Sequence, residues 1–340
     1  MCGIAGFIDP RGQVHDPREK LASMALRLAH RGPDDSGVWW NESRRVGFAH
    51  RRLSIIDLSS AGHQPMHSAS ERFTLVFNGE IYNAQVLRQE LDSHTRINWR
   101  GKSDTEVMLA AFEKWGVIDA TQKFNGMFAF ALFDLQTETI HLARDPIGKK
   151  PLYYGSIGRS FVFASELKAL HALSDGPMDI DRGVLSEFLR LGYVPGSQCI
   201  HPNLRKLQAG SVASITLACA AVGGEATVKK YWDACDLSKS SAASSYVADD
   251  ESLVSQMQTQ LERAVSRRMI SDVPLGAFLS GGVDSALVTA FMSRASNSPI
   301  KTFTIGFSDG AYDESDRATA IAKALGTDHA VVKLMQKDAM

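Results

Sequence analysis

The stretch MCGIAGFID, residues 1–9, places a cysteine directly behind the first methionine. A cysteine attacks a carbonyl carbon as its thiolate, and an ordinary thiol with a pKa of about 8.5 is mostly protonated at neutral pH. If Met1 is removed, the new α-amine of Cys2, with a pKa of about 7.7–8.0, can act as the base. Gly3 lets the backbone approach a substrate closely. Taken alone, the stretch also fits an incidental or buried cysteine.

The composition predicts an ordinary globular protein. The chain has 340 residues, 44% of them hydrophobic and 22% charged, which suffices for a sizeable core and for two domains. The formal net charge is −1 and the basic residues are scattered, so neither nucleic acid nor an anionic membrane is an expected partner. We expect small-molecule ligands instead.

The cysteines predict a cytoplasmic location. Cys2, Cys199, Cys219 and Cys235 lack the paired spacing of zinc or redox sites, and no secretory segment precedes them. We assign no role to the last three. The weakly polar run at 209–224 is too short for a bilayer, which needs roughly 20 apolar residues, and is interpreted as a strand and a turn.

The first part of the chain predicts antiparallel sheets with helical layers. Apolar residues at helical spacing predict helices at 18–30 and 104–116, the first followed by a turn at 30–37. Aromatic and β-branched runs predict six strands, the third and fourth of which form a hairpin. Because helices do not alternate one for one with strands, the pattern disfavours a doubly wound sheet. The predicted strands are 45–50, 72–80, 127–134, 139–144, 151–156 and 160–165.

The second part has a different pattern. Residues 236–252 are rich in Ser, Ala and Asp without an apolar period, which is typical of a linker. Strands and helices then alternate, as in a parallel α/β sheet. Three strands make a thin sheet, so we expect a small domain or a fragment. The predicted elements are helices at 249–269, 285–295 and 314–326 and strands at 273–280, 300–307 and 329–334.

Three polar motifs in the first part each allow two interpretations. RRLSIID at 51–57 offers two guanidiniums at the start of an apolar strand, and such a planar group suits a carboxylate. In FNGEIYN at 77–83, Asn-Gly is a common hairpin turn, but the Asn78 amide and the Gly79 N–H could also stabilise an oxyanion, with Glu80 taking an ammonium. Asp104 in GKSDTEV, 101–107, is either a helix cap or a ligand.

The stretch LSGGVDSALV at 279–288 predicts a phosphate-binding loop. It lies between a predicted strand and a predicted helix, where glycine amides converge and the helix dipole favours an anion. Ser280 and Ser285 add hydroxyl donors, and Asp284 could share a magnesium ion with the phosphates. A flexible turn is the alternative interpretation.

Together the motifs of the first part resemble class II glutamine amidotransferase domains, which have the N-terminal-nucleophile hydrolase fold, an αββα sandwich of antiparallel sheets. The resemblance covers roughly residues 2–210 and rests on MCGIAGF, HRGPDDSG, HRRLSIID, FNGEIYN, SDTE, GMFAFALFD, ARDPIGKKPLYY and FASELKAL. It implies that Cys2 attacks glutamine, that Asn78 and Gly79 form the oxyanion hole and that Arg52 binds the α-carboxylate. It further implies that Glu80 and Asp104 hold the α-ammonium and that the backbone of Leu53, Ser54, Ile55 and Ile56 lines the pocket.

The second motif resembles the pyrophosphate loop of N-type ATP pyrophosphatases. This resemblance implies contacts of Leu279 and Ile305 with adenosine, although both also suit a core. It implies ATP and Mg²⁺ as cofactors, with Asp284 as the metal ligand. The implied ATP-binding residues are Leu279, Ser280, Gly281, Gly282, Val283, Asp284, Ser285 and Ile305.

Both motifs in one chain resemble the glutamine-hydrolysing asparagine synthetase family. The expected domains are an amidotransferase domain at 2–212, a connecting segment at 213–250 and a partial ATP pyrophosphatase domain at 251–340. The implied partners are glutamine, ATP and a carboxylate acceptor, aspartate first; a homodimer is compatible. A sugar-acid acceptor in polysaccharide biosynthesis and a non-catalytic regulatory relative are the alternatives. Since the family continues for a few hundred residues past the loop, we expect a truncated synthetase half.

Overall fold

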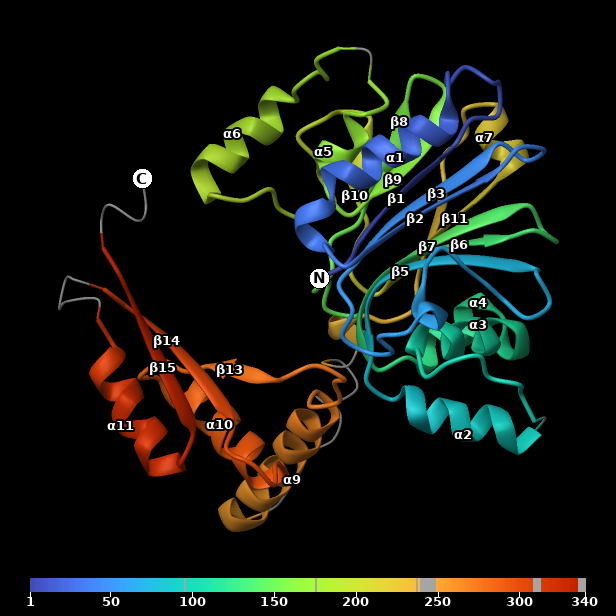
Figure 1. Cartoon of the computed structure of the whole chain (residues 1–340). Coiled ribbons are helices and arrows are strands. Elements are labelled where there is room, and N and C mark those ends of the chain that lie inside the picture. Colours follow the sequence, from blue (N-terminus) through green and yellow to red (C-terminus); the bar gives the residue numbers. More distant parts are fainter. Residues whose placement is uncertain (95, 175, 237, 239–248, 308–312, 336–340) are drawn as a thin grey trace. The chain divides into compact units, whose positions relative to one another are not determined.

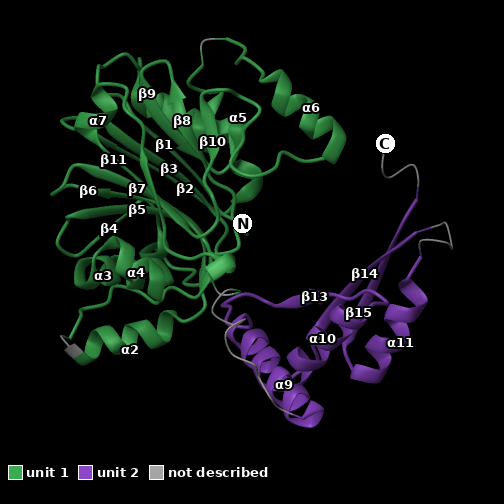
Figure 2. Cartoon of the chain, turned by 180° about the vertical axis from the view of Figure 1, so that it is seen from behind, with its two compact units in different colours: residues 1–243 green, residues 244–340 purple. Residues whose placement is uncertain are grey.

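The chain forms two compact units, residues 1–243 and 244–340 (Figure 2). The computed structural model describes residues 1–94, 96–174, 176–236, 238, 249–307 and 313–335 (Figure 1). Most of the predicted linker at 236–252 lies outside these residues. The domain boundaries expected from the sequence remain a prediction, and residues 213–230, which were assigned to the connecting segment, lie within the first unit.

Two six-stranded antiparallel sheets make up the centre of the first unit. The first sheet has the order β10-β8-β9-β1-β3-β2 and the second the order β12-β11-β7-β6-β5-β4. The strands of the first sheet are β10 (Leu204–Lys206), β8 (Tyr153–Ile157), β9 (Ser160–Ala164), β1 (Gly3–Ile8), β3 (Val46–Arg52) and β2 (Asp35–Asn41). Those of the second are β12 (Thr227–Lys230), β11 (Ser211–Thr216), β7 (Thr139–Arg144), β6 (Gly126–Asp134), β5 (Phe73–Ile81) and β4 (Met66–His67).

Helices cover the outer face of each sheet, so the unit has four layers (Figure 1). Helices α1 (Pro17–Arg27) and α5 (Leu167–Leu170) pack on the first sheet through a core that includes Met24 and Leu170. Helices α2 (Ala84–His94), α3 (Asp104–Trp115) and α4 (Val117–Lys123) pack on the second sheet. A third core lies between the sheets. The predicted αββα sandwich of antiparallel sheets is confirmed.

Strand β1 fixes the start of the chain in the middle of the first sheet. It pairs antiparallel with β3 on one side and with β9 on the other, and all six of its residues are buried. A Cβ on Gly6 would lie 2.5 Å from the Gly47 carbonyl oxygen and 2.5 Å from the Phe163 ring, so only glycine fits there. The strand was not predicted from the sequence, because its small residues have weak β propensity.

The other predicted elements of the first unit are mostly present. The six predicted strands correspond to β3, β5, β6, β7, β8 and β9, and β6 and β7 form the predicted hairpin. The strand-and-turn interpretation of 209–224 is confirmed by β11 and by a turn at 222–223, but it missed the short helix α7 (Leu217–Ala221), capped by Thr216, that lies between them. Strand β2, helix α2, helix α4, helix α6 (Arg182–Leu191) and the short edge strands were not predicted.

The second unit contains a three-stranded parallel sheet of order β13-β14-β15, as the alternation predicted. Phe303, Ile305 and Phe307 of β14 point to a face on which each is 41% to 47% exposed, whereas the alternate residues are buried. Parallel sheets in globular proteins are normally covered on both faces. The strands are β13 (Gly276–Phe278), β14 (Lys301–Phe307) and β15 (Asp328–Leu334), with helices α9 (Asp250–Arg267), α10 (Val283–Ala295) and α11 (Ser315–Leu325). No helix among the described residues has the length and apolar character needed to cross a membrane.

Candidate active site

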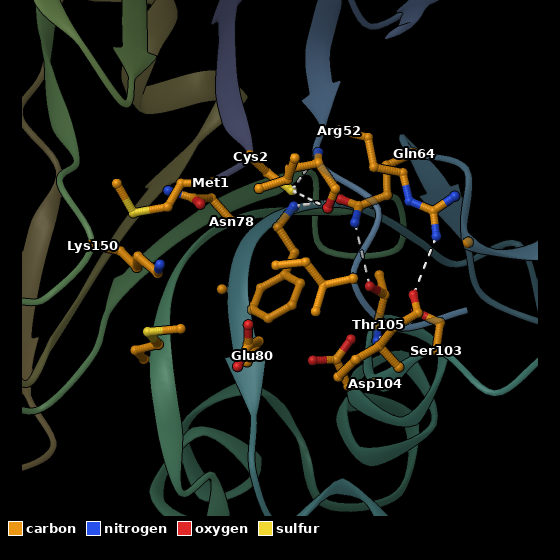
Figure 3. A pocket seen from close by; sticks show the side chains of 17 residues that line it. Met1, Cys2, Arg52, Gln64, Asn78, Glu80, Ser103, Asp104, Thr105 and Lys150 are labelled. Atoms are coloured by element: carbon orange, nitrogen blue, oxygen red, sulfur yellow. Dashed lines mark hydrogen bonds between the residues drawn. The ribbon is translucent and has the colours of Figure 1, made fainter. Parts of the chain in front are cut away.

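A pocket of about 130 Å³ lies in the first unit, and most of the predicted glutamine-site residues line it (Figure 3). Ser54 is the exception: its N–H donates to the Asp34 carboxylate at 2.8 Å, and it does not line the pocket. The predicted residues that do line it are Cys2, Arg52, Leu53, Ile55, Ile56, Asn78, Gly79, Glu80 and Asp104. Residues separated by about a hundred positions in sequence are thus brought to one site.

The Cys2 thiol lies against the backbone that follows β3. The Leu53 N–H points to Cys2 Sγ at 3.4 Å, and the thiol contacts the Leu53 carbonyl at 3.7 Å. Burial raises the pKa of this thiol, although the Leu53 backbone opposes the shift. The sulfur is therefore protonated at neutral pH unless a base removes its proton.

Asn78 and Gly79 lie within strand β5 and not in a turn, so the hairpin-turn interpretation of FNGEIYN is wrong. The two residues pair with Ala129 and Phe128 of β6 in an uninterrupted antiparallel ladder. The Asn78 side chain is completely buried, and neither its Nδ2 nor its Oδ1 has a hydrogen-bond partner among the described residues. Leaving a buried amide unpaired costs about 1–3 kcal/mol, so this donor is available for a ligand.

Arg52 ends β3 and holds the loop that follows. Its Nη1 donates to the Ser59 carbonyl at 3.1 Å, and its Nη2 donates to the Ile56 carbonyl at 3.3 Å and to the Asp57 carbonyl. Residues 53–57 therefore form a loop, and the apolar strand predicted there is absent. Arg51, the second predicted guanidinium, donates to the Gly32 carbonyl and does not line the pocket.

Asp104 begins α3 but does not cap it. The cap is Ser103, whose hydroxyl accepts the Thr105 N–H at 3.1 Å, so the cap interpretation of Asp104 is wrong. The Asp104 carboxylate accepts the Ile81 N–H at 2.9 Å. Burial raises the pKa of Asp104 to about 6, and the nearby charge of Glu80 adds to that rise. A buried carboxylate with a second one beside it is a favourable place for a substrate ammonium.

Two histidines, His30 and His50, lie close in sequence to the predicted site residues. His50 is buried, its Nε2 lies 3.1 Å from the Phe77 carbonyl, and burial lowers its pKa to about 3. It is thus neutral at physiological pH. His30 contacts Glu166 at 3.0 Å and does not line the pocket. Neither ring is placed to act as the base for Cys2.

Several pocket residues were missed by sequence reasoning. Gln64 accepts the Phe77 N–H at 2.6 Å and donates to Thr105 at 3.3 Å, which links the two sides of the pocket. Gly62 leaves room for the Arg52 guanidinium, since a Cβ there would overlap it. Met127 and Lys150 complete the wall. The only signal for Lys150 was its place in ARDPIGKKPLYY, to which no role was assigned.

The predicted phosphate loop connects β13 to α10 in the second unit. The hydroxyls of Ser280 and Ser285 lie 2.9 Å apart across the loop. The Gly281 N–H donates to the Glu314 carboxylate at 3.2 Å, so an anionic group already contacts a loop amide there. Asp284 lies in the exposed first turn of α10. The glycine N–H and the two serine hydroxyls of the loop are hydrogen-bond donors of the kind that bind phosphate.

The two residues implied to contact adenosine differ in environment. Leu279 is 2% exposed and packs with Ala318 and Ala322 of α11, so it belongs to the core. Ile305 lies on the uncovered face of β14 and is 47% exposed. Among the described residues, no three His, Cys, Asp or Glu side chains are grouped to hold a metal ion. That Asp284 shares a magnesium ion with phosphate oxygens remains a prediction.

Residues 1–232 match the family model described as glutamine amidotransferase domain. The chain belongs to this family. Residues 256–340 match a second family model, described as asparagine synthase. The predicted family resemblance is confirmed by these two matches.

Curated relatives cover nearly the whole chain. It is 34% identical over 331 residues to asparagine synthetase [glutamine-hydrolyzing] 1 of Bacillus subtilis, covering 97% of this chain and 49% of that protein. It is 34% identical over 350 residues to a putative asparagine synthetase [glutamine-hydrolyzing] 2 of Methanocaldococcus jannaschii, covering 97% and 64%. The chain thus spans about half to two thirds of the length of these relatives. A relative named amidase chry2, from Gibberella zeae, is 30% identical over 357 residues, covering 98% of this chain and 51% of that protein.

The fold also resembles a solved structure. The structure described as the allosteric regulatory enzyme of purine biosynthesis has 15% sequence identity and a TM-score of 0.51, covering 98% of this chain and 80% of that one. At this identity the similarity concerns the fold alone.

The unpaired Asn78 amide predicts an unusual stability effect. Asn78→Leu should raise the free energy of unfolding by roughly 1–2 kcal/mol, because an apolar side chain of similar size removes the cost of burying an unsatisfied amide. All five tryptophans lie in the first unit, so urea unfolding followed by tryptophan fluorescence measures this change.

Asn83→Leu is the matched control. The Asn83 amide donates to the Lys123 carbonyl and accepts the Asn125 N–H, both at 2.9 Å, so its loss should lower stability by about 1–2 kcal/mol. Equal destabilisation by both substitutions would show that Asn78 is satisfied in the folded protein.

Proposed function

We propose that the chain hydrolyses glutamine at Cys2 and passes the ammonia to a carboxylate that ATP has activated. The observation that carries the proposal is the buried, unpaired Asn78 carboxamide in the same pocket as the Cys2 thiol. A donor left unsatisfied in the free protein is a preorganised partner for charge that develops during the reaction. Family membership and the names of the curated relatives support the same chemistry.

The pocket offers complementary groups for free glutamine. Glu80 and Asp104 would hold the α-ammonium, and Arg52 would bind the α-carboxylate, with the loop carbonyls sharing its guanidinium. The Asn78 amide and the Gly79 N–H would donate to the side-chain carbonyl oxygen. This arrangement positions the substrate Cδ for attack by the Cys2 sulfur, and holding both reactants in place supplies a large part of the rate enhancement.

Removal of Met1 would leave the base on the nucleophile's own residue. The Cys2 α-amine accepts the thiol proton, the sulfur attacks Cδ, and the same proton passes to the leaving nitrogen as the C–N bond breaks. The products of this step are ammonia and a γ-glutamyl thioester. Water then attacks the thioester, giving its proton to the amine, and releases glutamate with return of the proton to sulfur.

The second unit would activate the acceptor. An acceptor carboxylate oxygen would attack the α-phosphorus of ATP, releasing pyrophosphate and forming an acyl adenylate. Ammonia would then attack the acyl carbon and AMP would leave, giving an amide. The Gly281 amide and the hydroxyls of Ser280 and Ser285 suit the released pyrophosphate, and Mg²⁺ would neutralise phosphate charge beside Asp284.

Cys2→Ala should abolish glutaminase activity, with a loss of at least about 10³-fold in kcat, because no other group in the pocket can form the thioester. Release of glutamate from glutamine by the intact protein measures this. Cys235→Ala, at an exposed cysteine outside the pocket, should leave the rate unchanged. Equal rates for Cys2→Ala and the unaltered protein would eliminate Cys2 as the nucleophile.

Asp104 should make glutamine binding depend on pH. Because its pKa is raised to about 6, the carboxylate becomes protonated below about pH 6 and no longer pairs with the α-ammonium. KM for glutamine should therefore rise as the pH falls through 6, and Asp104→Asn should show a KM that is roughly 10- to 100-fold higher at pH 7.5 and loses this pH dependence.

The same pKa predicts the stability of the Asp104→Asn variant. Between the ordinary pKa of an aspartate, about 4, and about 6, the folded protein keeps a proton that the unfolded chain releases, so stability falls as the pH rises across that window. Asp104→Asn should remove this fall. Glu113→Gln, at an exposed position of the same helix, serves as control.

For the KM prediction, a pH profile of KM in Asp104→Asn that equals that of the unaltered protein would contradict the ammonium-binding role.

We further propose aspartate as the acceptor and asparagine as the product. The names of the relatives from Bacillus subtilis and Methanocaldococcus jannaschii support this choice. With glutamine, ATP and Mg²⁺, the intact protein should form asparagine and AMP in equal amounts. An amide formed on a uronic acid but not on aspartate would overturn the assignment.

A further inference from the structure

Lys150 is a buried cation in the wall of the pocket that no step above uses. The residue is 4% exposed and lines the same pocket as Cys2. Among the residues that the structure describes, its Nζ has no hydrogen-bond or ion-pair partner. Figure 3 shows Lys150 on the side of the pocket where Met1 lies, with Arg52, Ser103 and Asp104 on the opposite side. Lys150 is therefore near the chain start and across the pocket from Arg52 and Asp104.

The turn that follows β7 fixes the backbone of Lys150. The Asp145 carboxylate is fully buried and accepts the N–H groups of Lys149 and Lys150, each at 2.9 Å. The Arg144 Nε donates to the Lys150 carbonyl at 2.7 Å. Gly148 completes the turn with φ +68°, a conformation that favours glycine. Both backbone polar groups of Lys150 are thus clamped, and the adjacent Lys149 is exposed.

Burying the Lys150 ammonium group in the pocket wall carries an energetic cost. Burial lowers the pKa of Lys150, which reports the cost of removing the charge from water. A neutral side chain of the same length would avoid that cost. A buried charge without a partner in the free protein suggests a role in the chemistry of the site.

The charges around Lys150 come from three other parts of the fold and from its own turn. Glu80 of β5 attracts its ammonium most strongly, Arg31 of the short helix η1 (Ala29–Arg31) repels it, and Cys2 and Asp145 attract it. In the chain that still carries Met1, burial lowers the pKa of the Met1 α-amine, Cys2 and Asp34 raise it, and Lys150 and Arg31 lower it. The positive charges of Lys150 and Arg31 therefore both disfavour a proton on the Met1 amine. Removal of Met1 would expose the Cys2 amine in the same pocket as Lys150, where this positive charge would act in the same direction.

We propose that Lys150 is a positioning residue for the glutaminase reaction: its fixed positive charge keeps the α-amine of Cys2 in the neutral form that accepts the thiol proton. The inference rests on the proposed function, because it assumes that the amine is the base. In this role Lys150 neither gives nor accepts a proton, so the proton balance of the reaction is unchanged. Its effect is electrostatic and acts through the amine.

The test is the pH profile of kcat/KM for glutamine hydrolysis by the intact protein carrying Lys150→Met. Without the charge the amine holds its proton to higher pH, so the acidic limb of the profile should move to higher pH. At pH 7 kcat/KM should fall roughly three- to tenfold, the effect of one charge in a partly solvated site. The difference should vanish above about pH 9, where the amine is free of its proton in both proteins.

Two variants separate this role from a structural one. Lys150→Arg retains the charge and should restore the acidic limb, whereas Lys149→Met on the same turn should behave like the unaltered protein. The thermal unfolding midpoint of Lys150→Met should be equal or higher, because the substitution removes a buried charge. If Lys150→Met folds poorly, Lys150→Gln takes its place in the measurement of the pH profile of kcat/KM.

The outcomes that overturn the inference are distinct from failure of the proposed function. A Lys150→Met profile that superimposes on that of the unaltered protein overturns it. So does a rise in KM with an unshifted profile, which would mean that Lys150 binds the substrate carboxylate. Full activity of Cys2→Ala would instead reject the proposed function, whatever Lys150→Met does.

Discussion

The pairing of β1 with strands on both of its sides is the constraint on which the site depends. A chain terminus is normally the least ordered part of a domain, but here β3 and β9 hold residues 3–8 in the centre of a sheet. The residue immediately before the strand, Cys2, is consequently fixed against the Leu53 backbone. A nucleophile at the chain start is precise only if the start cannot move. The glycine at position 6, which permits close approach of the neighbouring strands, is part of the same requirement.

The pocket concentrates polar groups whose placement favours a ligand at the expense of stability. The buried Asn78 amide has no hydrogen-bond partner in the part of the chain that the structure describes, Asp104 is a buried carboxylate with a raised pKa, and Lys150 is a buried ammonium. Each would cost less as an apolar side chain in the free protein. Together they offer a donor, an anion and a cation at separate points of one small cavity. In the proposed reaction the donor and the anion would bind glutamine, whereas the cation would act on the α-amine of Cys2.

The sequence predicted the four-layer architecture and most of the site, because long apolar strands and family motifs carry strong signals. It did not predict β1, whose small residues have weak strand propensity. It allowed a turn at Asn78-Gly79, but pairing of these residues with β6 overrides their local preference for a turn. The interpretation of Asp104 as a helix cap was wrong because Ser103 is the residue that caps α3, through the Thr105 N–H. Gln64 and Lys150 could not be predicted as pocket residues from spacing, since only the tertiary fold brings them to Cys2. The roles of the site residues remain predictions.

The most direct test of the account is intact-protein mass spectrometry of the enzyme mixed with glutamine and quenched in acid. The account predicts a protein that lacks Met1 and a transient species heavier by one glutamyl group, which peptide mapping locates on the N-terminal peptide carrying Cys2. Retention of Met1 on molecules that still hydrolyse glutamine at full rate would contradict it. A glutamyl group found on any other peptide would contradict it equally.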